Sequence, residues 1–179
     1  MKKIILAAIF GLISFASFAQ ENVIKVNPLA LLGGTDLVSY ERALGDQSSA
    51  IVGAGYAGYK FGGFKYTNIG GRLEYRYYFD EVLSGWFAGG IAQYQSGKVE
   101  SETSDIFGTD ELDSETNFSS FGVGAKAGYQ WVWDSGFSLD LSLGANYSKF
   151  SYDDEDGAFA TLEGSGIFPQ FGFGLGYAF

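Results

Sequence analysis

A glycine pattern in the chain has the spacing of a dinucleotide-binding turn. The glycines of Gly53-x-Gly55-x-x-Gly58 follow an apolar pair, and Glu74 stands about where a ribose-binding acid would lie. Such a turn needs a helix next, whose amino end faces the pyrophosphate. Residues 59–71 are instead rich in glycine and lead into an alternating pattern. We therefore interpret the three glycines as strand residues and predict no cofactor.

Two residue types that serve most catalytic and metal sites are missing. The 179 residues include no His and no Cys. Ser-His-Asp triads, Cys nucleophiles, disulfides and the usual structural zinc sites are thereby excluded. A pair of carboxylates remains a formal acid–base catalyst, but no spacing favours one. We predict no catalytic residue, no metal ligand set and no enzyme activity.

Two acidic segments, 97–117 and 153–166, are expected to be loops. Clustered carboxylates suit divalent cations, although Gly157 stands in the wrong position for an EF-hand. The favoured alternative is a pair of solvated loops that could serve as a surface for recognition. The acidic-loop residues are Glu100, Glu102, Asp105, Asp110, Glu111, Asp113, Glu115, Asp153, Asp154, Glu155 and Asp156.

The rest of the chain is close to electrically neutral, with 9 acids against 8 bases. From residue 20 onward there are 9 Lys and Arg against 21 Asp and Glu, and 12 of these acids lie in the two acidic segments. Phosphate binding requires a basic patch, and the sequence offers none. Nucleic acid is therefore excluded as a partner.

A third group of polar residues shares one face of a strand. Arg72, Glu74 and Arg76 alternate with apolar residues, and further polar residues are expected to face the same space. One interpretation is a selectivity or proton path. The favoured one is a network of salt bridges that fills the space, because buried charges must be paired. The predicted network comprises Lys25, Glu41, Arg72, Glu74, Arg76, Lys126, Gln130, Asp140 and Gln170.

The elements that position these residues are strands. Aromatic residues make up 18% of the chain, with 27 Gly and 2 Pro, a composition that disfavours helices. Apolar residues recur at every second position in four segments, 69–79, 121–133, 137–147 and 170–179. Four less regular strands are expected at 23–32, 36–44, 48–61 and 85–96, the first of which contains Pro28. Proline fits an edge, a strand end or a bulge.

The amino terminus has the pattern of a secretory signal peptide. Lys2 and Lys3 precede an apolar run, and small residues flank a cleavage site after Ala19. We therefore expect a leader at 1–19 and one β-barrel domain at 20–179. The residue after the cleavage site is Gln20 rather than Cys, which excludes a lipoprotein.

The orientation of the strands decides which of their faces meets the lumen and which meets the surroundings of the barrel. The polar face is rich in glycine, as a narrow lumen requires, and the connections after even-numbered strands are short. Aromatic residues of the apolar face gather before these short turns, like an interfacial girdle. The fold class predicted is all-β, an eight-stranded antiparallel up-and-down transmembrane barrel with its apolar face toward lipid.

The last strand resembles a known signal. The alternation of Phe173, Leu175, Tyr177 and a terminal Phe179 is similar to the carboxyl-terminal motif that outer-membrane barrels present to the barrel-assembly machinery. The whole chain resembles the small OmpA/OmpX-like barrels. Val26-Asn27-Pro28-Leu29, with the segment 38–44, is similar to an uncharacterised secreted barrel family of Bacteroidota.

The resemblance implies a location rather than an activity. It places the chain in the Gram-negative outer membrane as a monomer, with the acidic loops outside the cell. Members of the wider group include anchors, adhesins, host-resistance proteins and an acyltransferase, and none of these roles transfers by fold alone. We expect a structural or cell-surface interaction role. The alternatives are a porin-like pore for small solutes and an adhesin that uses the acidic loops.

Overall fold

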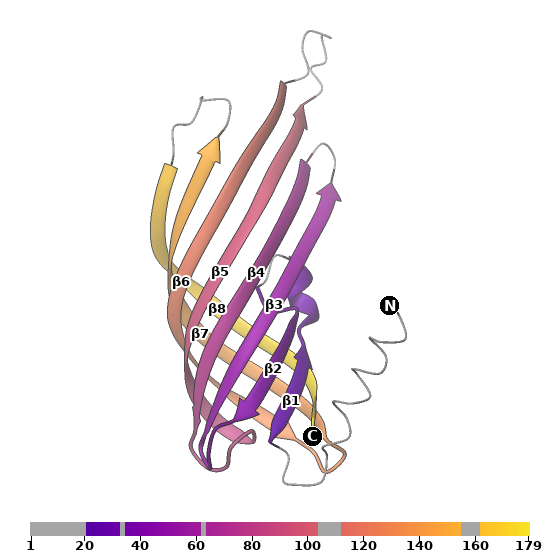
Figure 1. Cartoon of the computed structure of the whole chain (residues 1–179), viewed down its shortest axis with the longest axis vertical. Coiled ribbons are helices and arrows are strands. Elements are labelled where there is room, and N and C mark those ends of the chain that lie inside the picture. Colours follow the sequence, from indigo (N-terminus) through magenta and orange to yellow (C-terminus); the bar gives the residue numbers. More distant parts are fainter. Residues whose placement is uncertain (1–20, 33–34, 62–63, 104–111, 155–161) are drawn as a thin grey trace.

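The computed structural model describes residues 21–32, 35–61, 64–103, 112–154 and 162–179 as a closed antiparallel barrel. Each strand pairs with the next along the chain, and the first pairs with the last, which confirms the predicted all-β, eight-stranded antiparallel up-and-down barrel (Figure 1). No helix in these ranges is long and apolar enough to cross a membrane. The elements are β1 Asn22–Val26, the 3-10 helix η1 Pro28–Leu32, β2 Val38–Ala43, β3 Ser48–Phe61, β4 Phe64–Tyr78, β5 Gly85–Thr103, β6 Leu112–Val132, β7 Phe137–Asp154 and β8 Leu162–Ala178.

The two faces of the strands meet different surroundings. Leu141 and Leu143 point outward, with 42% and 63% of their surface exposed, whereas Ser142 between them is buried. Lys126 likewise points into the barrel from β6. Successive residues of a strand face opposite sides, so this one register turns the apolar residues of β7 from Phe137 to Tyr147 outward. The predicted orientation, apolar outside and polar inside, is confirmed.

The ring of eight strands is complete over only part of its height. β1 and β2 have 5 and 6 residues, whereas β5 and β6 have 19 and 21. β1 pairs with β8 only from Val23–Ala178 to Val26–Leu175, and β2 pairs with β3 no further than Ala54. Above this level the sheet from β3 to β8 is open on one side (Figure 1). We call the two levels the closed half and the open half.

The first strand is shorter than the sequence predicts. Residues 28–32 form η1 rather than the end of a strand at 23–32. The Asn27 side-chain oxygen accepts a hydrogen bond from the Leu29 N–H at 3.1 Å, and the Asn27 carbonyl accepts one from Ala30 at 3.0 Å. An Asn followed by Pro favours such a turn. The apolar residues after Pro28 therefore belong to a helical turn.

The predicted acidic loops are wrong over much of their length. The ladder of β5 and β6 continues to Thr103 and Leu112, and β7 and β8 extend to Asp154 and Leu162. Antiparallel strands can face water, so these two pairs continue beyond the region where one face is apolar. For this reason, an alternation of apolar residues could not mark where the strands end. Glu100, Glu102, Asp113, Glu115, Asp153 and Asp154 lie in strands, and Asp105, Asp110, Glu111, Glu155 and Asp156 lie outside the described residues.

The other end of the barrel consists of short turns, as the sequence predicts. The connections from β2 to β3, β4 to β5 and β6 to β7 span residues 44–47, 79–84 and 133–136. The last of these turns needs its glycine, because Gly136 has a φ of 81°. The three glycines of the formal dinucleotide pattern lie within β3 and are followed by β4, so no helix stands there to receive a pyrophosphate.

Candidate functional site

The closed half is filled by polar side chains from five strands. The four inward positions of one stretch of β4 carry Arg72, Glu74, Arg76 and Tyr78, one above the other, because strand positions two apart share a face. Other strands supply their partners across the lumen. We call this group the plug: Lys25, Glu41, Arg72, Glu74, Arg76, Tyr78, Lys126, Gln130 and Asp140.

Arg76 lies at the centre of the plug and is 1% exposed. Its Nε donates to Glu74 Oε1 at 2.5 Å, and its Nη1 forms an ion pair with Asp140. Nη1 also lies 3.8 Å from Glu41 Oε2 and donates to Gln130 Oε1 at 3.0 Å. Three carboxylates thus surround one guanidinium, which satisfies a charge that would be costly to bury alone.

Arg76 is held from a further side by an aromatic ring. The guanidinium carbon lies 3.9 Å from the centroid of Phe87, a cation–π contact. Tyr78 packs on the same ring and donates its hydroxyl to Glu41 Oε1 at 2.7 Å. The position of Arg76 is therefore fixed by charge, hydrogen bonds and packing together.

Lys25 joins the first strand to the opposite wall. Its Nζ lies 2.5 Å from Glu41 Oε2, 2.8 Å from Asp140 Oδ2 and 2.6 Å from Gln130 Oε1. Ser49 adds a hydrogen bond to Glu41 Oε1 at 2.5 Å. Because Lys25 and Glu41 stand on the two short strands, these contacts tie β1 and β2 to the long strands through the lumen as well as through the ladder.

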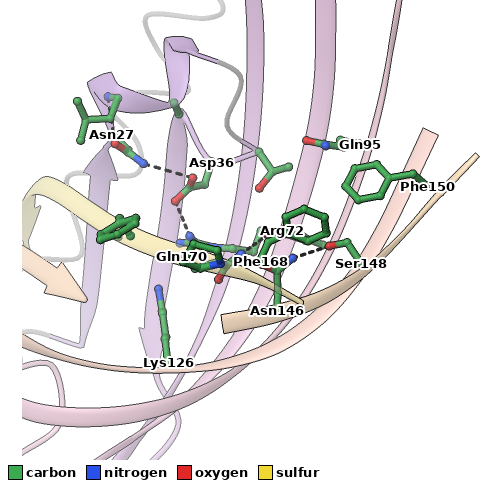
Figure 2. Close-up of a pocket in the computed structure, with 17 residues that line it drawn as sticks. Asn27, Asp36, Arg72, Gln95, Lys126, Asn146, Ser148, Phe150, Phe168 and Gln170 are labelled. Carbon is green, nitrogen blue, oxygen red and sulfur yellow. Dashed lines mark hydrogen bonds and ion pairs between the residues drawn. The ribbon is translucent and has the colours of Figure 1, made fainter. Parts of the chain in front are cut away.

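At the upper edge of the plug, cations and carboxylates again pair with one another. Lys126 Nζ and Arg72 Nη2 lie 2.7 and 3.4 Å from Glu74 Oε2. Arg72 Nη1 pairs with Asp36 Oδ2 at 2.5 Å (Figure 2). Four cations thus face four carboxylates, Asp36 included, and the cluster carries no net charge.

An apolar layer closes the lumen below the plug. Leu83, from the turn between β4 and β5, is 3% exposed and packs against Val23 and Ala178. Its carbonyl accepts a hydrogen bond from Gln130 Nε2 at 2.8 Å. Its φ of 66° is a left-handed conformation that costs a branched residue about 1–2 kcal/mol. Packing and this hydrogen bond hold the turn folded into the mouth of the barrel.

The space inside the barrel is therefore divided. A void of about 10 Å³ lies within the plug, near the smallest space that holds one water. A cavity of about 310 Å³ lies above it (Figure 2) and another of about 710 Å³ lies at the turn end. The plug and the Leu83 layer separate these two cavities, so the described residues leave no continuous channel.

The upper cavity has walls of two kinds. Asp36, Arg72, Lys126, Asn146 and Gln170 line its interior with charged and amide groups, as Figure 2 shows. Apolar residues complete it, among them Leu29 and Ala30 of η1 and Phe168, Pro169 and Phe171 of β8. No group of three or more carboxylates that could hold a metal occurs in the described part of the chain. The upper cavity thus presents groups that can hydrogen-bond to a ligand next to an apolar surface.

The structure brings together eight of the nine residues assigned to the lumen network. The ninth, Gln170, lies in the upper cavity, where its Nε2 donates to Gln93 Oε1 at 2.8 Å. Sequence reasoning did not assign Tyr78 a role, although it shares the inward face of Arg76. Asp36 and Leu83 stand in connections, where no periodicity indicates which side chains point inward.

The residues of the predicted assembly signal lie at the end of the last strand. Phe173, Leu175 and Tyr177 follow the outward face of β8. Phe179 comes just after the strand, and its N–H donates to the Asn22 carbonyl at 2.8 Å, where the first and last strands meet. The motif thus coincides with the seam that closes the ring.

Comparison with known proteins gives a family and no activity. No curated protein and no solved structure matches the chain. The model of the family DUF3575, described as a protein of unknown function, matches residues 4–160, which include all the strands from β1 to β7. The chain therefore belongs to the DUF3575 family.

Proposed function

We propose that this protein is an outer-membrane β-barrel with a closed lumen and a structural or cell-surface interaction role. The observation that carries the proposal is the outward face, where an apolar band lies between two belts of aromatic residues. Such a band is the surface that a transmembrane barrel presents to lipid.

The height of the band matches a bilayer. The outward residues of β7 run from Phe137 through three leucines and Ala145 to Tyr147, and those of β6 run from Phe121 to Trp131. Ten residues extend about 33 Å along a strand, which is about 25 Å of height at a tilt of about 40°. No charged residue faces outward over these stretches of β6 and β7. Lipid is the solvent that suits such a surface.

The aromatic belts mark the two edges of the band. Near the turns the exposed aromatics are Tyr75, Tyr77, Phe79, Trp86, Trp131, Trp133, Phe137 and Tyr177. Near the other edge they are Tyr56, Tyr94, Phe121 and Tyr147. Tyrosine and tryptophan favour the interface between lipid and water. In water, the same surface would be an apolar patch far larger than a monomeric soluble protein exposes.

The two ends of the barrel differ, and this difference supports an orientation of the barrel in the membrane. Short turns close one end, and the acid-rich ends of β5 and β6 project far beyond the ring at the other (Figure 1). Outer-membrane barrels have short periplasmic turns and longer extracellular parts. We therefore assign the acidic end to the cell exterior, where it offers a surface for a partner or for divalent cations.

The plug supports a closed barrel rather than a pore. Eight strands enclose a lumen that side chains fill, and here a neutral ion-pair cluster and the Leu83 layer fill it. The finer assignments complete the proposal. They are an OmpA/OmpX-like barrel of Bacteroidota, a signal peptide at 1–19, insertion as a monomer by the barrel-assembly machinery, and no catalytic activity.

Two measurements on one preparation test the proposal. Protein expressed in a Gram-negative host should appear in the outer-membrane fraction and should migrate faster on a denaturing gel unboiled than boiled, because a folded barrel resists the detergent. The same protein in planar bilayers should show no steady conductance. Soluble protein with no shift on boiling would contradict the membrane assignment. A stable open channel would contradict the closed lumen and favour the small-solute pore.

A further inference from the structure

The wall of the open half has a gap between η1 and β8. β1 ends at Val26, and β2 starts at Val38 on the same level. Above that level no described strand pairs with the outer edge of β8 from 162 to 174. The edge of β3 is covered, because η1 packs beside it. Two strands would occupy about 10 Å at this place. The opening that remains on the β8 side is called the side window here.

The upper cavity reaches the outside through this window. Gln170 and Gly172 of β8 line the cavity, and so do Pro169 and Phe171, which belong to the outward face of the same strand. Phe171 is 76% exposed. The edge of β8 beside these residues is unpaired, so no described strand separates the cavity from the outside there. The cavity is therefore open sideways.

The window lies at the depth of the apolar band. Pro169 pairs with Ala145 and Phe171 pairs with Leu143, and both partners stand between the aromatic belts of β7. If the barrel spans a membrane as proposed, the window faces lipid on the side of the acidic end. Pro169 has no N–H to offer to an added strand. The window therefore favours a lipid chain over a strand of another molecule.

The cavity changes character from the window inward. Leu29 of η1 and Phe171 stand at the opening, and amide and charged groups lie behind them. Arg72 Nε is buried without a hydrogen-bond acceptor, although both terminal nitrogens of this guanidinium have carboxylate partners. The guanidinium therefore has one donor at the wall of the cavity that no protein acceptor uses. The cavity's volume of about 310 Å³ lies at the lower end of the range of small-molecule sites, about 300–1,000 Å³.

We propose that the upper cavity binds a membrane amphiphile that enters through the side window. Its oxygen-rich head accepts hydrogen bonds from Arg72 and from the amides of Gln93 and Asn146. Its apolar tail leaves past Leu29 and Phe171 into the bilayer. This inference rests on the proposed membrane location, and it goes beyond it in naming a ligand class and a route.

The test uses barrels folded in phosphatidylcholine vesicles with spin-labelled phosphatidylglycerol as the probe. Electron paramagnetic resonance should show the fast-exchanging lipid shell of any membrane barrel and, in addition, about one long-lived immobilised lipid per barrel. Leu29→Trp narrows the window and should reduce the long-lived component at least fivefold. Leu31→Trp is the matched control, because Leu31 is an exposed η1 residue outside the cavity.

Each outcome has a separate meaning. Gln93→Leu removes an amide from the cavity without touching the plug, and it should weaken the long-lived component severalfold. Equal spectra for Leu29→Trp and Leu31→Trp, or a lipid shell without any long-lived component, would overturn the inference while leaving the membrane proposal intact. Dimers linked through β8 in place of bound lipid would also overturn it. The absence of every motion-restricted lipid would overturn the proposed function itself.

Discussion

The closed and open halves of this barrel are filled in opposite ways. In the closed half, a ring of eight strands encloses four cations and four carboxylates in contact, and the lumen is filled. In the open half, six long strands continue without β1 and β2, and a cavity with a side window remains. The difference shows that two short strands decide where this lumen is packed. Stability should therefore depend on the closed half, and ligand binding should depend on the open half.

The largest effect is expected where the central cation is removed. Arg76→Met leaves Glu41, Glu74 and Asp140 buried with too few partners, and should destabilise the barrel by about 3–5 kcal/mol. The measurement is the free energy of unfolding by urea in lipid vesicles. Arg42→Met is the control, because Arg42 is exposed on β2. Equal losses for the two variants would mean that the plug does not hold the closed half together.

The apolar layer below the plug should come next. Leu83→Ala removes a buried side chain and leaves a cavity, and it should lower the free energy of unfolding by about 2–3 kcal/mol. The exposed Leu44, in the neighbouring short turn, gives the matched control Leu44→Ala. Unfolding in urea reports the difference. A Leu83→Ala barrel as stable as the Leu44→Ala barrel would show that the turn end contributes no packing.

A smaller effect concerns one ion pair at the upper edge of the plug. Removing Glu74 leaves Arg72 with Asp36 and Arg76 with Asp140, so the cation that loses its close carboxylate is Lys126. Glu74→Gln and Lys126→Met should each destabilise the barrel. In a double-mutant cycle the pair should show a coupling of about 1–3 kcal/mol. If the double variant lost only the sum of the two single losses of stability, Glu74 and Lys126 would not be coupled within the plug.

The smallest effect is expected in the open half. Lys65 Nζ donates to Glu100 Oε2 at 3.0 Å, and this hydrogen bond lowers the pKa of the Glu100 carboxyl below its ordinary value. A lowered pKa in the folded state means that the contribution is present in full above the ordinary value of about 4.3. It is lost as the pH falls from there through the lower pKa of the folded state. Exposed pairs are screened. Glu100→Gln should therefore leave the urea midpoint at pH 7 unchanged, whereas a clear loss would contradict the contrast between the halves.

The sequence predicts the closed half better than the open one. Strict alternation along 137–147 predicts β7, its register and its outward face, because one face is apolar throughout. Six of the predicted plug residues stand in such alternating segments, whereas Lys25 and Glu41 stand in less regular ones. The polar ends of β5 and β6 lack that signal, so the sequence places loops where Glu100 and Glu115 lie in strands.

Other features depend on contacts that no local pattern encodes. The turn at Asn27 ends the first strand although the residues that follow it are apolar. The inward fold of Leu83 depends on Gln130, which is 47 residues away in the sequence. The side window exists because β1 and β2 are short, which is a property of the whole ring.

A cysteine scan of β7 in lipid vesicles tests the central claim most directly, because the chain has no native cysteine. Spin labels at Leu139, Leu141 and Leu143 should be accessible to oxygen dissolved in the lipid and shielded from a water-soluble nickel reagent. Labels at the intervening inward positions, 140 and 142, should be shielded from oxygen. Outward labels that respond to the nickel reagent as water-exposed sites do would contradict the claim that this face meets lipid.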